Sequence, residues 1–308
     1  MQLKNSNVII KRLITWIIAL AILGFMFSRI NVQELYNSVV LADSYTYLAW
    51  LTIFCILWFL LDAQNIFATC RSFNHEITYK EMLGIRGITY LLLIISYILS
   101  AGGIAAYLKH DKGIAISRGT SLVLFYSIVT QIALFLMAIL GCLLLDELSS
   151  ETTIVLVYSV LSVVATVVGA VLFKYIPKKG ILGKVKNIKI LTTFAEADFK
   201  TYVKLSCFRI VYYASFIIFY YVALKTFHMT IPLLILIAYV PIILLIISMP
   251  ITPFGMGTSQ AAMVFFFKDF GTEANILAFG LVYSTSILLF RGIIGLFFIN
   301  KLSAVKRK

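Results

Sequence analysis

The sequence has little charge, and this scarcity decides the class of protein. Charged residues make up 13% of the 308 residues, whereas hydrophobic residues make up 61%. Soluble domains contain about a quarter charged residues, because their surfaces must be hydrated. The polar residues of this chain cannot cover a water-soluble core of that size, which excludes a soluble globular protein. The composition therefore predicts an all-α polytopic membrane protein.

Histidine and cysteine are also scarce, with three and four residues respectively. The cysteines are isolated, and each lies in or beside an apolar run: Cys55, Cys70, Cys142 and Cys207. Such placement is typical of small buried residues and predicts neither a disulfide framework nor a metal site. A nucleophile elbow, a phosphate loop and a paired-carboxylate motif are absent as well. We expect no cofactor and no metal. No residue pattern typical of catalysis is visible, and the sequence leaves open whether the protein is an enzyme.

Acidic residues are fewer than basic ones, with 13 Asp and Glu against 26 Lys and Arg. In a soluble protein this excess would indicate nucleic acid as a partner. Here the positive charges lie in loops between apolar runs, as the positive-inside bias and anionic lipid headgroups require. We therefore expect contacts with membrane phospholipid, through anionic headgroups, and no nucleic acid.

Eight apolar stretches divide the chain, and most have about the 20 residues that one membrane crossing needs. They lie at about 13–30, 46–69, 85–107, 119–145, 153–176, 203–224, 231–268 and 275–299. The first follows Lys4, Lys11 and Arg12 and has no small-residue cleavage site after it. We interpret it as an uncleaved first membrane helix.

Loop charge predicts the orientation of the crossings. Loops at 70–86, 108–118 and 174–204 are basic and placed inside, together with both termini; loops at 31–45 and 146–152 are acidic and placed outside. Both ends of the third stretch are then inside and both ends of the seventh are outside, so neither crosses. We expect about six full crossings, two re-entrant helical hairpins and a location in the plasma membrane with cytoplasmic termini. Within the basic loop, 187–200 is either a helix on the cytoplasmic surface or a plain connector.

The two hairpins are predicted to turn at Ser100–Gly103 and at Pro250–Gly257, where glycine or proline is frequent. Irregular backbone at membrane depth must be buried or line a polar cavity, so the two turns are expected to meet near the midplane. The order of elements predicts an inverted-topology repeat within one transmembrane domain. Repeat one covers about 1–147, repeat two about 148–308, and the cytoplasmic basic loop about 174–204. Such repeats are typical of alternating-access transporters.

Three ionisable residues lie inside apolar stretches, where charge is costly and indicates function by default. Asp62 is either a functional acid or an interfacial acid paired with Arg71 or Arg86. Arg209 lies near the end of its stretch, so snorkelling to the interface is the preferred explanation. Arg291 lies deeper; it is either a substrate or gate residue suited to phosphate, or the partner of a buried acid.

The stretch Pro250–Gln260 contains two prolines and two glycines, which break a helix and allow a sharp turn. The candidate path residues are Gly102 and Gly103 in the first hairpin, and Thr252, Pro253, Gly255, Gly257 and Gln260 in the second. A helix that begins at Thr258 would direct exposed amides toward the turn and favour an anion there. The alternative is a packed structural hairpin without a ligand.

Motifs of the second half are Pro250-x-Thr252-Pro253-x-Gly255-x-Gly257-x-x-Gln260-Ala261, then Phe270-Gly271, Leu289-Phe290-Arg291-Gly292 and Gly295. Together with Asn65–Arg71, Ser100–Gly103 and Lys112–Ile114, they resemble the flippase-like transmembrane domain of lysylphosphatidylglycerol synthases over nearly the whole chain. The first hairpin departs from the family pattern, because Ala101–Ala105 lacks the family's proline and Gly-Glu pair. No role of that glutamate is carried over.

The resemblance implies a stand-alone member without the aminoacyl-transferring domain: a lipid flippase that moves a phospholipid or lipid-linked substrate between leaflets. Asp62, Arg209, Arg291 and the two hairpin turns would line the path of the headgroup. One alternative is a membrane component of a lipid-modifying enzyme, in an aminoacyl-phospholipid or glycolipid pathway, with a separate catalytic partner protein. Another is an accessory subunit of an envelope machine.

Overall fold

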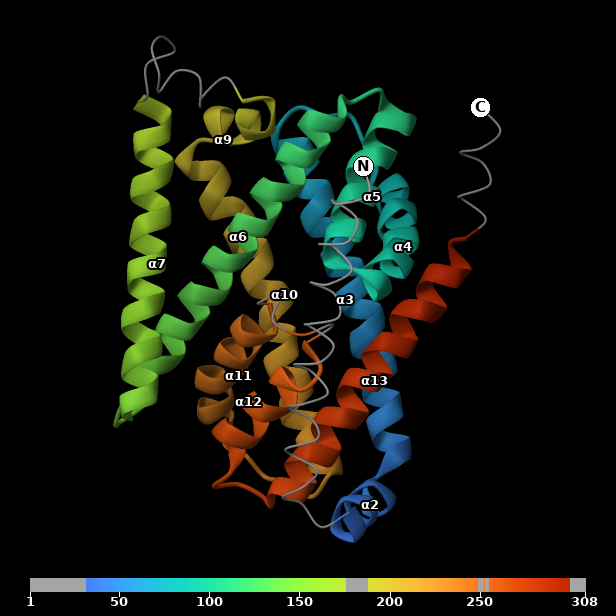
Figure 1. Ribbon diagram of the computed structural model, residues 1–308, viewed down its shortest axis with the longest axis vertical. Helices are drawn as coiled ribbons and strands as arrows, with labels where there is room; N and C mark the ends of the chain where they lie inside the picture. The colour runs from blue at the N-terminus through green and yellow to red at the C-terminus, as the bar shows by residue number, and fades with distance from the viewer. Residues whose placement is uncertain (1–31, 176–187, 249–251, 253–254, 300–308) are drawn as a thin grey trace, which may run out of the picture. The chain divides into compact units, whose positions relative to one another are not determined.

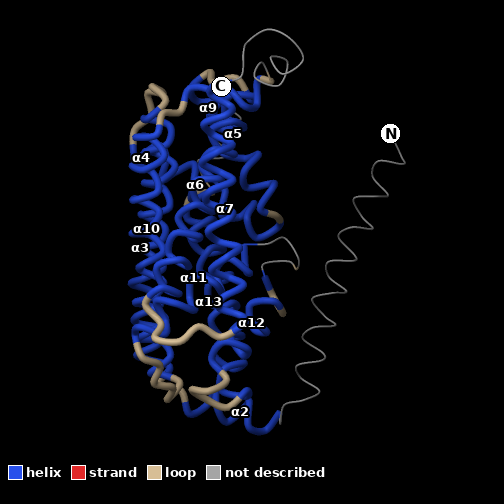
Figure 2. The backbone as a smooth tube through the Cα atoms, turned by 90° about the vertical axis from the view of Figure 1, so that its left-hand side faces the viewer, coloured by secondary structure: helices blue, strands red, loops and turns tan. Residues whose placement is uncertain are grey.

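The computed structural model describes residues 32–175, 188–248, 252 and 255–299. The described chain folds into helices joined by short loops (Figures 1 and 2). The helices are α2 (Val32–Leu41), α3 (Ser44–Ser72), α4 (Tyr79–Ile95), α5 (Tyr97–Lys112), α6 (Ile116–Leu143), α7 (Ser150–Tyr175), the 3-10 helix η1 (Lys189–Leu191), α9 (Thr192–Glu196), α10 (Phe199–Thr226), α11 (Leu233–Ser248), α12 (Thr258–Phe267) and α13 (Glu273–Phe297).

Within the described ranges, five helices are long and apolar enough to cross a membrane: α3, α6, α7, α10 and α13. They coincide with five of the crossings that the sequence predicts. The other predicted crossing, at 13–30, lies outside the described residues. The protein is therefore an all-α, multi-pass membrane protein, as its composition indicates.

The chain divides into two compact units. Unit 1 consists of residues 1–52 and 217–287, and unit 2 of residues 53–216 and 288–308. Three of the long helices, α3, α10 and α13, contribute residues to both units.

In unit 2, α4 and α5 pack side by side as a helical hairpin (Figure 1). The helices break at Ser96, whose backbone is extended (φ −169°, ψ 140°) and whose hydroxyl accepts a hydrogen bond from the Ile98 amide. The predicted turn at Ser100–Gly103 is wrong, because those residues lie inside α5. Gly103 instead allows close packing, since a Cβ there would lie 2.5 Å from Leu92 Cδ1. With 17 and 16 residues, each helix is shorter than the roughly 20 residues that a crossing needs.

The core of unit 2 also includes α6, which packs against α5 where Gly119 meets Ala105. At the start of α6, Arg118 pairs with Glu196 of α9 and also donates to Thr192. The amide of Thr193 donates to the hydroxyl of Ser121 on α6. The described part of 187–200 is a 3-10 turn, a five-residue helix packed on α6 and the start of α10, so no long surface helix forms there. Its place relative to the membrane stays a prediction.

In unit 1, α11 and α12 also pack against each other. They have 16 and 10 residues, so neither is long enough to cross alone. The chain reaches α12 through Gly255 and Gly257, which have positive φ angles of 69° and 85°. Glycine adopts such angles without the Cβ clash that other residues meet, which explains why this turn is built from glycine.

Candidate functional site

Asp62 is the centre of a buried polar cluster in unit 2. It lies on α3 with 3% of its surface exposed. Two nitrogens of Arg86, on α4, contact its Oδ2 atom at 2.7 and 2.6 Å. Arg209, on α10, contacts its Oδ1 atom at 3.1 Å. Both arginines are buried as well, so one carboxylate holds two guanidinium groups away from water.

Two tyrosines complete the shell of this carboxylate. Tyr126, on α6, donates a hydrogen bond to Oδ1, and Tyr90, on α4, donates one to Oδ2 at 3.3 Å. The guanidinium of Arg209 also lies over the ring of Tyr126, 4.7 Å from its centroid. A carboxylate has about four lone-pair sites, so both oxygens of Asp62 are fully used.

The first hairpin is tied directly to this cluster. Arg86 donates from Nη1 to the hydroxyl of Ser100 on α5, at 3.2 Å. Ser100 is 1% exposed and lies inside the helix that carries Gly102 and Gly103. Gly103 packs against Thr89 and Leu92 of α4, whereas a Cβ at Gly102 would meet nothing within 4 Å. The cluster thus joins α3, α4, α5, α6 and α10.

The snorkelling predicted for Arg209 is wrong. Its side chain is buried beside Asp62 and lies among the rings of Tyr126, Tyr212 and Tyr213. An opposite charge and aromatic faces within reach stabilise the guanidinium where it is, so the side chain does not extend to the interface. Its Nε atom is buried without a hydrogen-bond partner among the described residues.

Arg291 lies on the edge of the same cluster. Its guanidinium is 6.0 Å from the centroid of Tyr90, a ring that Arg86 also covers at 4.9 Å. Glycines bring α13 this close to α4: Gly295 lies against Leu91, and Gly87 lies against Phe298. The buried acid expected as one possible partner of Arg291 is not found, since no carboxylate of the described residues pairs with it.

The second hairpin, in unit 1, is held by Gln260 at the start of α12. Its Oε1 atom accepts from the Gly257 amide at 2.8 Å and from the Ser259 hydroxyl at 2.8 Å. Its Nε2 atom donates to the Gly280 carbonyl at 3.1 Å and to the Ser284 hydroxyl at 3.0 Å. All four hydrogen bonds that an amide side chain can make are used inside the protein.

The remaining predicted residues of this turn are partly described. Thr252 is buried, and its hydroxyl contacts the Thr258 hydroxyl at 3.0 Å, which in turn donates to the Gly255 carbonyl. Pro253 lies outside the described residues. The candidate residues therefore form one group in each unit, and the expected meeting of the two turns stays a prediction.

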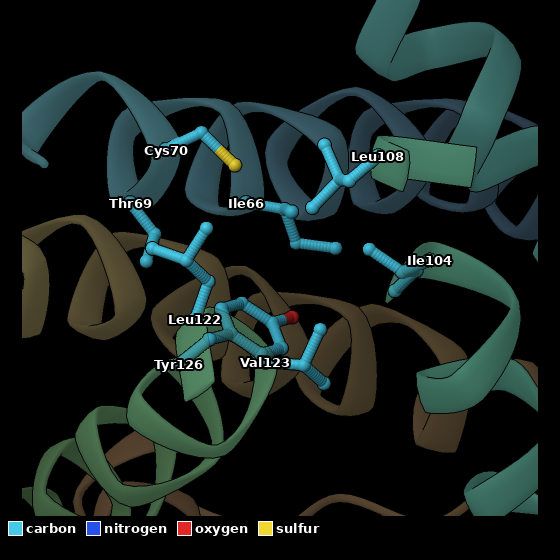
Figure 3. Close-up of a pocket in the computed structure, with 8 residues that line it drawn as sticks. All are labelled: Ile66, Thr69, Cys70, Ile104, Leu108, Leu122, Val123 and Tyr126. Carbon is cyan, nitrogen blue, oxygen red and sulfur yellow. The ribbon is translucent and has the colours of Figure 1, made fainter. Parts of the chain in front are cut away.

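A small cavity lies next to the Asp62 cluster in unit 2 (Figure 3). Its walls are Ile66, Thr69, Cys70, Ile104, Leu108, Leu122, Val123 and Tyr126. Tyr126 belongs to both the cavity and the cluster, because its ring forms one wall of the cavity while its hydroxyl donates to Asp62. This cavity is too small and too apolar for a lipid headgroup, and Asp62, Arg86 and Arg209 beside it are buried.

Sequence reasoning missed Tyr90, Tyr126 and Ser100 as partners of the cluster, and named Arg86 only as one possible partner of Asp62. A signal was available for part of it. Arg86 and Tyr90 are four residues apart, as are Arg209 and Tyr213, and this spacing places both members of a pair on one helix face. Among the described residues, no group of His, Cys, Asp or Glu could hold a metal ion.

These features define a multi-pass α-helical membrane protein with a buried cluster of one acid, two arginines and two tyrosines. The chain belongs to the family described as Lysylphosphatidylglycerol synthase TM region, which matches residues 9–295. The resemblance inferred from its motifs is thereby confirmed. No curated protein and no solved structure matches the chain.

Proposed function

We propose that this protein moves a phospholipid or lipid-linked substrate between the two leaflets of a membrane. The observation that carries the proposal is the buried cluster of Asp62, Arg86 and Arg209. Charges inside a membrane protein are costly and are kept where a polar group must pass or bind. Membership of a family named for a lipid-synthesising protein supports a lipid as the substrate.

The two hairpins supply the second part of the proposal. We take α4–α5 and α11–α12 as re-entrant segments of an inverted repeat, with both termini in the cytoplasm and the protein in the plasma membrane. The helix lengths and the breaks at Ser96 and at Gly255–Gly257 support this topology. Broken helices of this kind surround the substrate in alternating-access transporters. In unit 2, the path of the headgroup would pass Arg291, Arg209, Asp62 and the first hairpin.

The proposal is tested in vesicles that contain the purified protein and a trace of acyl-chain-labelled fluorescent phospholipid. Dithionite quenches the outer leaflet only, so transbilayer movement appears as further loss of fluorescence. We expect movement above that of protein-free vesicles. The variants Asp62→Asn and Arg209→Gln should slow it about tenfold or more, because each removes a charge-assisted contact.

Arg71→Gln is the matched control, since Arg71 lies exposed at the end of α3 and the change removes the same charge. It should leave the rate unchanged. Movement equal to that of empty vesicles would refute the proposal.

A second candidate function is the membrane component of a lipid-modifying enzyme with a separate catalytic partner, which the family description also favours. The two are distinguished by the lipids of a deletion strain. Loss of a modified lipid from total extracts favours the enzyme component. An unchanged lipid inventory with altered leaflet distribution favours translocation.

A further inference from the structure

The short helix α2, in unit 1, has an apolar face that the protein leaves exposed. Tyr36, Val39 and Val40 form this face and are 63%, 40% and 59% exposed. Their spacing of three and four residues makes them neighbours on the helix surface. Glu34 and Asn37, which are also exposed, lie two residues from Tyr36 and Val39, so they point to the other side of the helix. The helix is therefore amphipathic.

Contacts within unit 1 attach α2 to the end of α10. Leu35 is buried. The amide of Asp43 donates to the Thr226 carbonyl at 2.9 Å, and a ring nitrogen of His228 lies 3.0 Å from the Leu41 carbonyl. These contacts hold both ends of the link between α2 and α3, so the apolar face is presented by a helix whose position is fixed within its unit.

The chain leads from this face directly into a membrane crossing. Two residues separate the end of α2 at Leu41 from the start of α3 at Ser44, and α3 is long and apolar enough to span a bilayer. Its first turns expose Tyr45 and Leu48, so exposed apolar residues continue from α2 into α3. Lipid surrounds the exposed apolar surface of a crossing helix, and tyrosine is enriched where such a helix meets the membrane surface.

Charge and size indicate what covers the apolar face. Residues 32–49 contain Glu34 and Asp43 and no Lys, Arg or His, so attraction to anionic headgroups does not hold the helix. A second copy of the chain is a poor fit as well. Three side chains of a ten-residue helix bury far less than the roughly 800 Å² per partner of a stable protein interface.

We infer that α2 lies in the interfacial layer of the membrane, with Tyr36, Val39 and Val40 inserted among the lipids, and that apolar contact rather than headgroup charge holds it there. The inference does not depend on the proposed transport. It fixes the depth of unit 1, because the contacts of Asp43 and Leu41 place the end of α10 at the same membrane surface.

The test measures the depth of nitroxide labels on the full-length protein in vesicles by electron paramagnetic resonance. Oxygen, which partitions into the bilayer, and a water-soluble nickel chelate relax the label according to its surroundings. Labels are attached to Tyr36→Cys and Val39→Cys and, as matched controls, to Glu34→Cys and Asn37→Cys. All four variants carry Cys207→Ser, which removes the exposed cysteine; the other cysteines, Cys55, Cys70 and Cys142, are buried.

Labels at Tyr36 and Val39 should lie about 5–10 Å below the headgroup boundary, as in other interfacial helices. Labels at Glu34 and Asn37 should remain accessible to the nickel chelate. Equal nickel accessibility on both sides of the helix would overturn the inference. Shielding of the Tyr36 and Val39 labels from both reagents would also overturn it, because protein rather than lipid would then cover the face.

The role of apolar contact is tested in vesicles of phosphatidylcholine alone and in vesicles with added phosphatidylglycerol. The Tyr36 label should reach the same depth in both. Insertion that occurs only with phosphatidylglycerol would overturn this part of the inference.

A second variant tests the same point from the protein side. Val40→Asp should move the Tyr36 label toward water, because a carboxylate is costly in an apolar layer. Asn37→Asp adds the same charge on the polar side and should leave the label where it is. Thermal unfolding shows that each labelled protein is folded. An unchanged depth in a folded Val40→Asp protein would contradict the inference.

Discussion

Each of the two hairpins consists of two short helices joined at a break, but the residues at the two breaks differ in their chemistry. In unit 2, α4 and α5 break at Ser96 with an extended backbone and a serine cap, and the adjoining cluster is charged. In unit 1, the turn before α12 uses two glycines with positive φ, and its polar contacts are neutral amides and hydroxyls. The neutral group satisfies every hydrogen bond of Gln260 internally, whereas in the charged group the Nε atom of Arg209 finds no partner in the part of the chain that the structure describes. We therefore expect the first hairpin to support binding and the second to brace the fold.

The largest effect is expected at Asp62. Asp62→Asn removes the charge that holds Arg86 and Arg209, and breaking a buried ion pair in this way costs about 3–5 kcal/mol. Denaturant-induced unfolding in detergent should show the loss. Adding Arg209→Gln to Asp62→Asn should recover part of it, because one unpaired charge is removed.

Asp43→Asn is the matched control, since Asp43 lies exposed before α3 and its side chain accepts a hydrogen bond from the Thr46 amide. Asparagine caps a helix as well as aspartate, so stability should hardly change. An Asp62→Asn protein as stable as Asp43→Asn would show that the cluster does not hold unit 2 together.

Gln260 tests the role of the second hairpin. Gln260→Leu leaves the Gly257 amide and the Gly280 carbonyl without their partner, and a buried unsatisfied group costs about 1–3 kcal/mol. Unfolding should therefore occur at a lower denaturant concentration, while the folded variant should still move phospholipid in vesicles. Ser284→Ala removes one of the four bonds and should cost less. Loss of lipid movement in a folded Gln260→Leu protein would contradict the division between a binding and a bracing hairpin.

Glycines of the two hairpins should respond with opposite signs. Gly257→Ala places a Cβ at φ 85°, and a left-handed backbone costs an ordinary residue about 1–2 kcal/mol. Gly102→Ala adds a methyl group inside α5 where nothing lies within 4 Å, and should stabilise the helix by about 0.5–1 kcal/mol. Thermal unfolding of the two variants measures the contrast. Destabilisation by Gly102→Ala would mean that its open side is occupied in the folded protein.

The smallest effect concerns Glu81 at the start of α4. Hydrogen bonds from Lys112 and the Thr78 amide lower the pKa of Glu81 from 4.5 to about 2. Because the folded pKa is the lower one, the stabilisation is present above pH 4.5 and is lost as the pH falls toward 2. The pair is exposed, so it contributes only about 0.5 kcal/mol. Glu81→Gln should remove this pH dependence from the unfolding curve, and an unchanged curve would show that Lys112 and Thr78 do not stabilise the charge.

Much of the fold was predictable from the sequence. Long apolar runs identify the crossings at α3, α6, α7, α10 and α13, because the bilayer sets their length. The break within the third stretch was predicted, but its position was not. Ser96 lies in a continuous apolar run, and the capping bond that ends α4 there gives no signal in a count of apolar residues.

The site was predictable only in part. Asp62, Arg209 and Arg291 were identified because charge is rare in such stretches. Their mutual contacts were not, since Asp62 and Arg209 are 147 residues apart along the chain and only the folded helices bring them together. Tyrosines are frequent here, 17 in all, so nothing in composition distinguishes Tyr90 and Tyr126 from the rest. Gln260 was assigned to the lipid path, and its four internal bonds were visible only in the structure.

The glycines between α4 and α13 have a consequence for how unit 2 can move. Each helix offers one glycine that receives a large side chain of the other segment: Gly295 faces Leu91, and Gly87 faces Phe298. A small slide of α13 along α4 would push Leu91 and Phe298 against the side chains next to these glycines at the same time. The two glycine contacts therefore fix the register of α13 against α4, and with it the backbone position from which Arg291 reaches Tyr90.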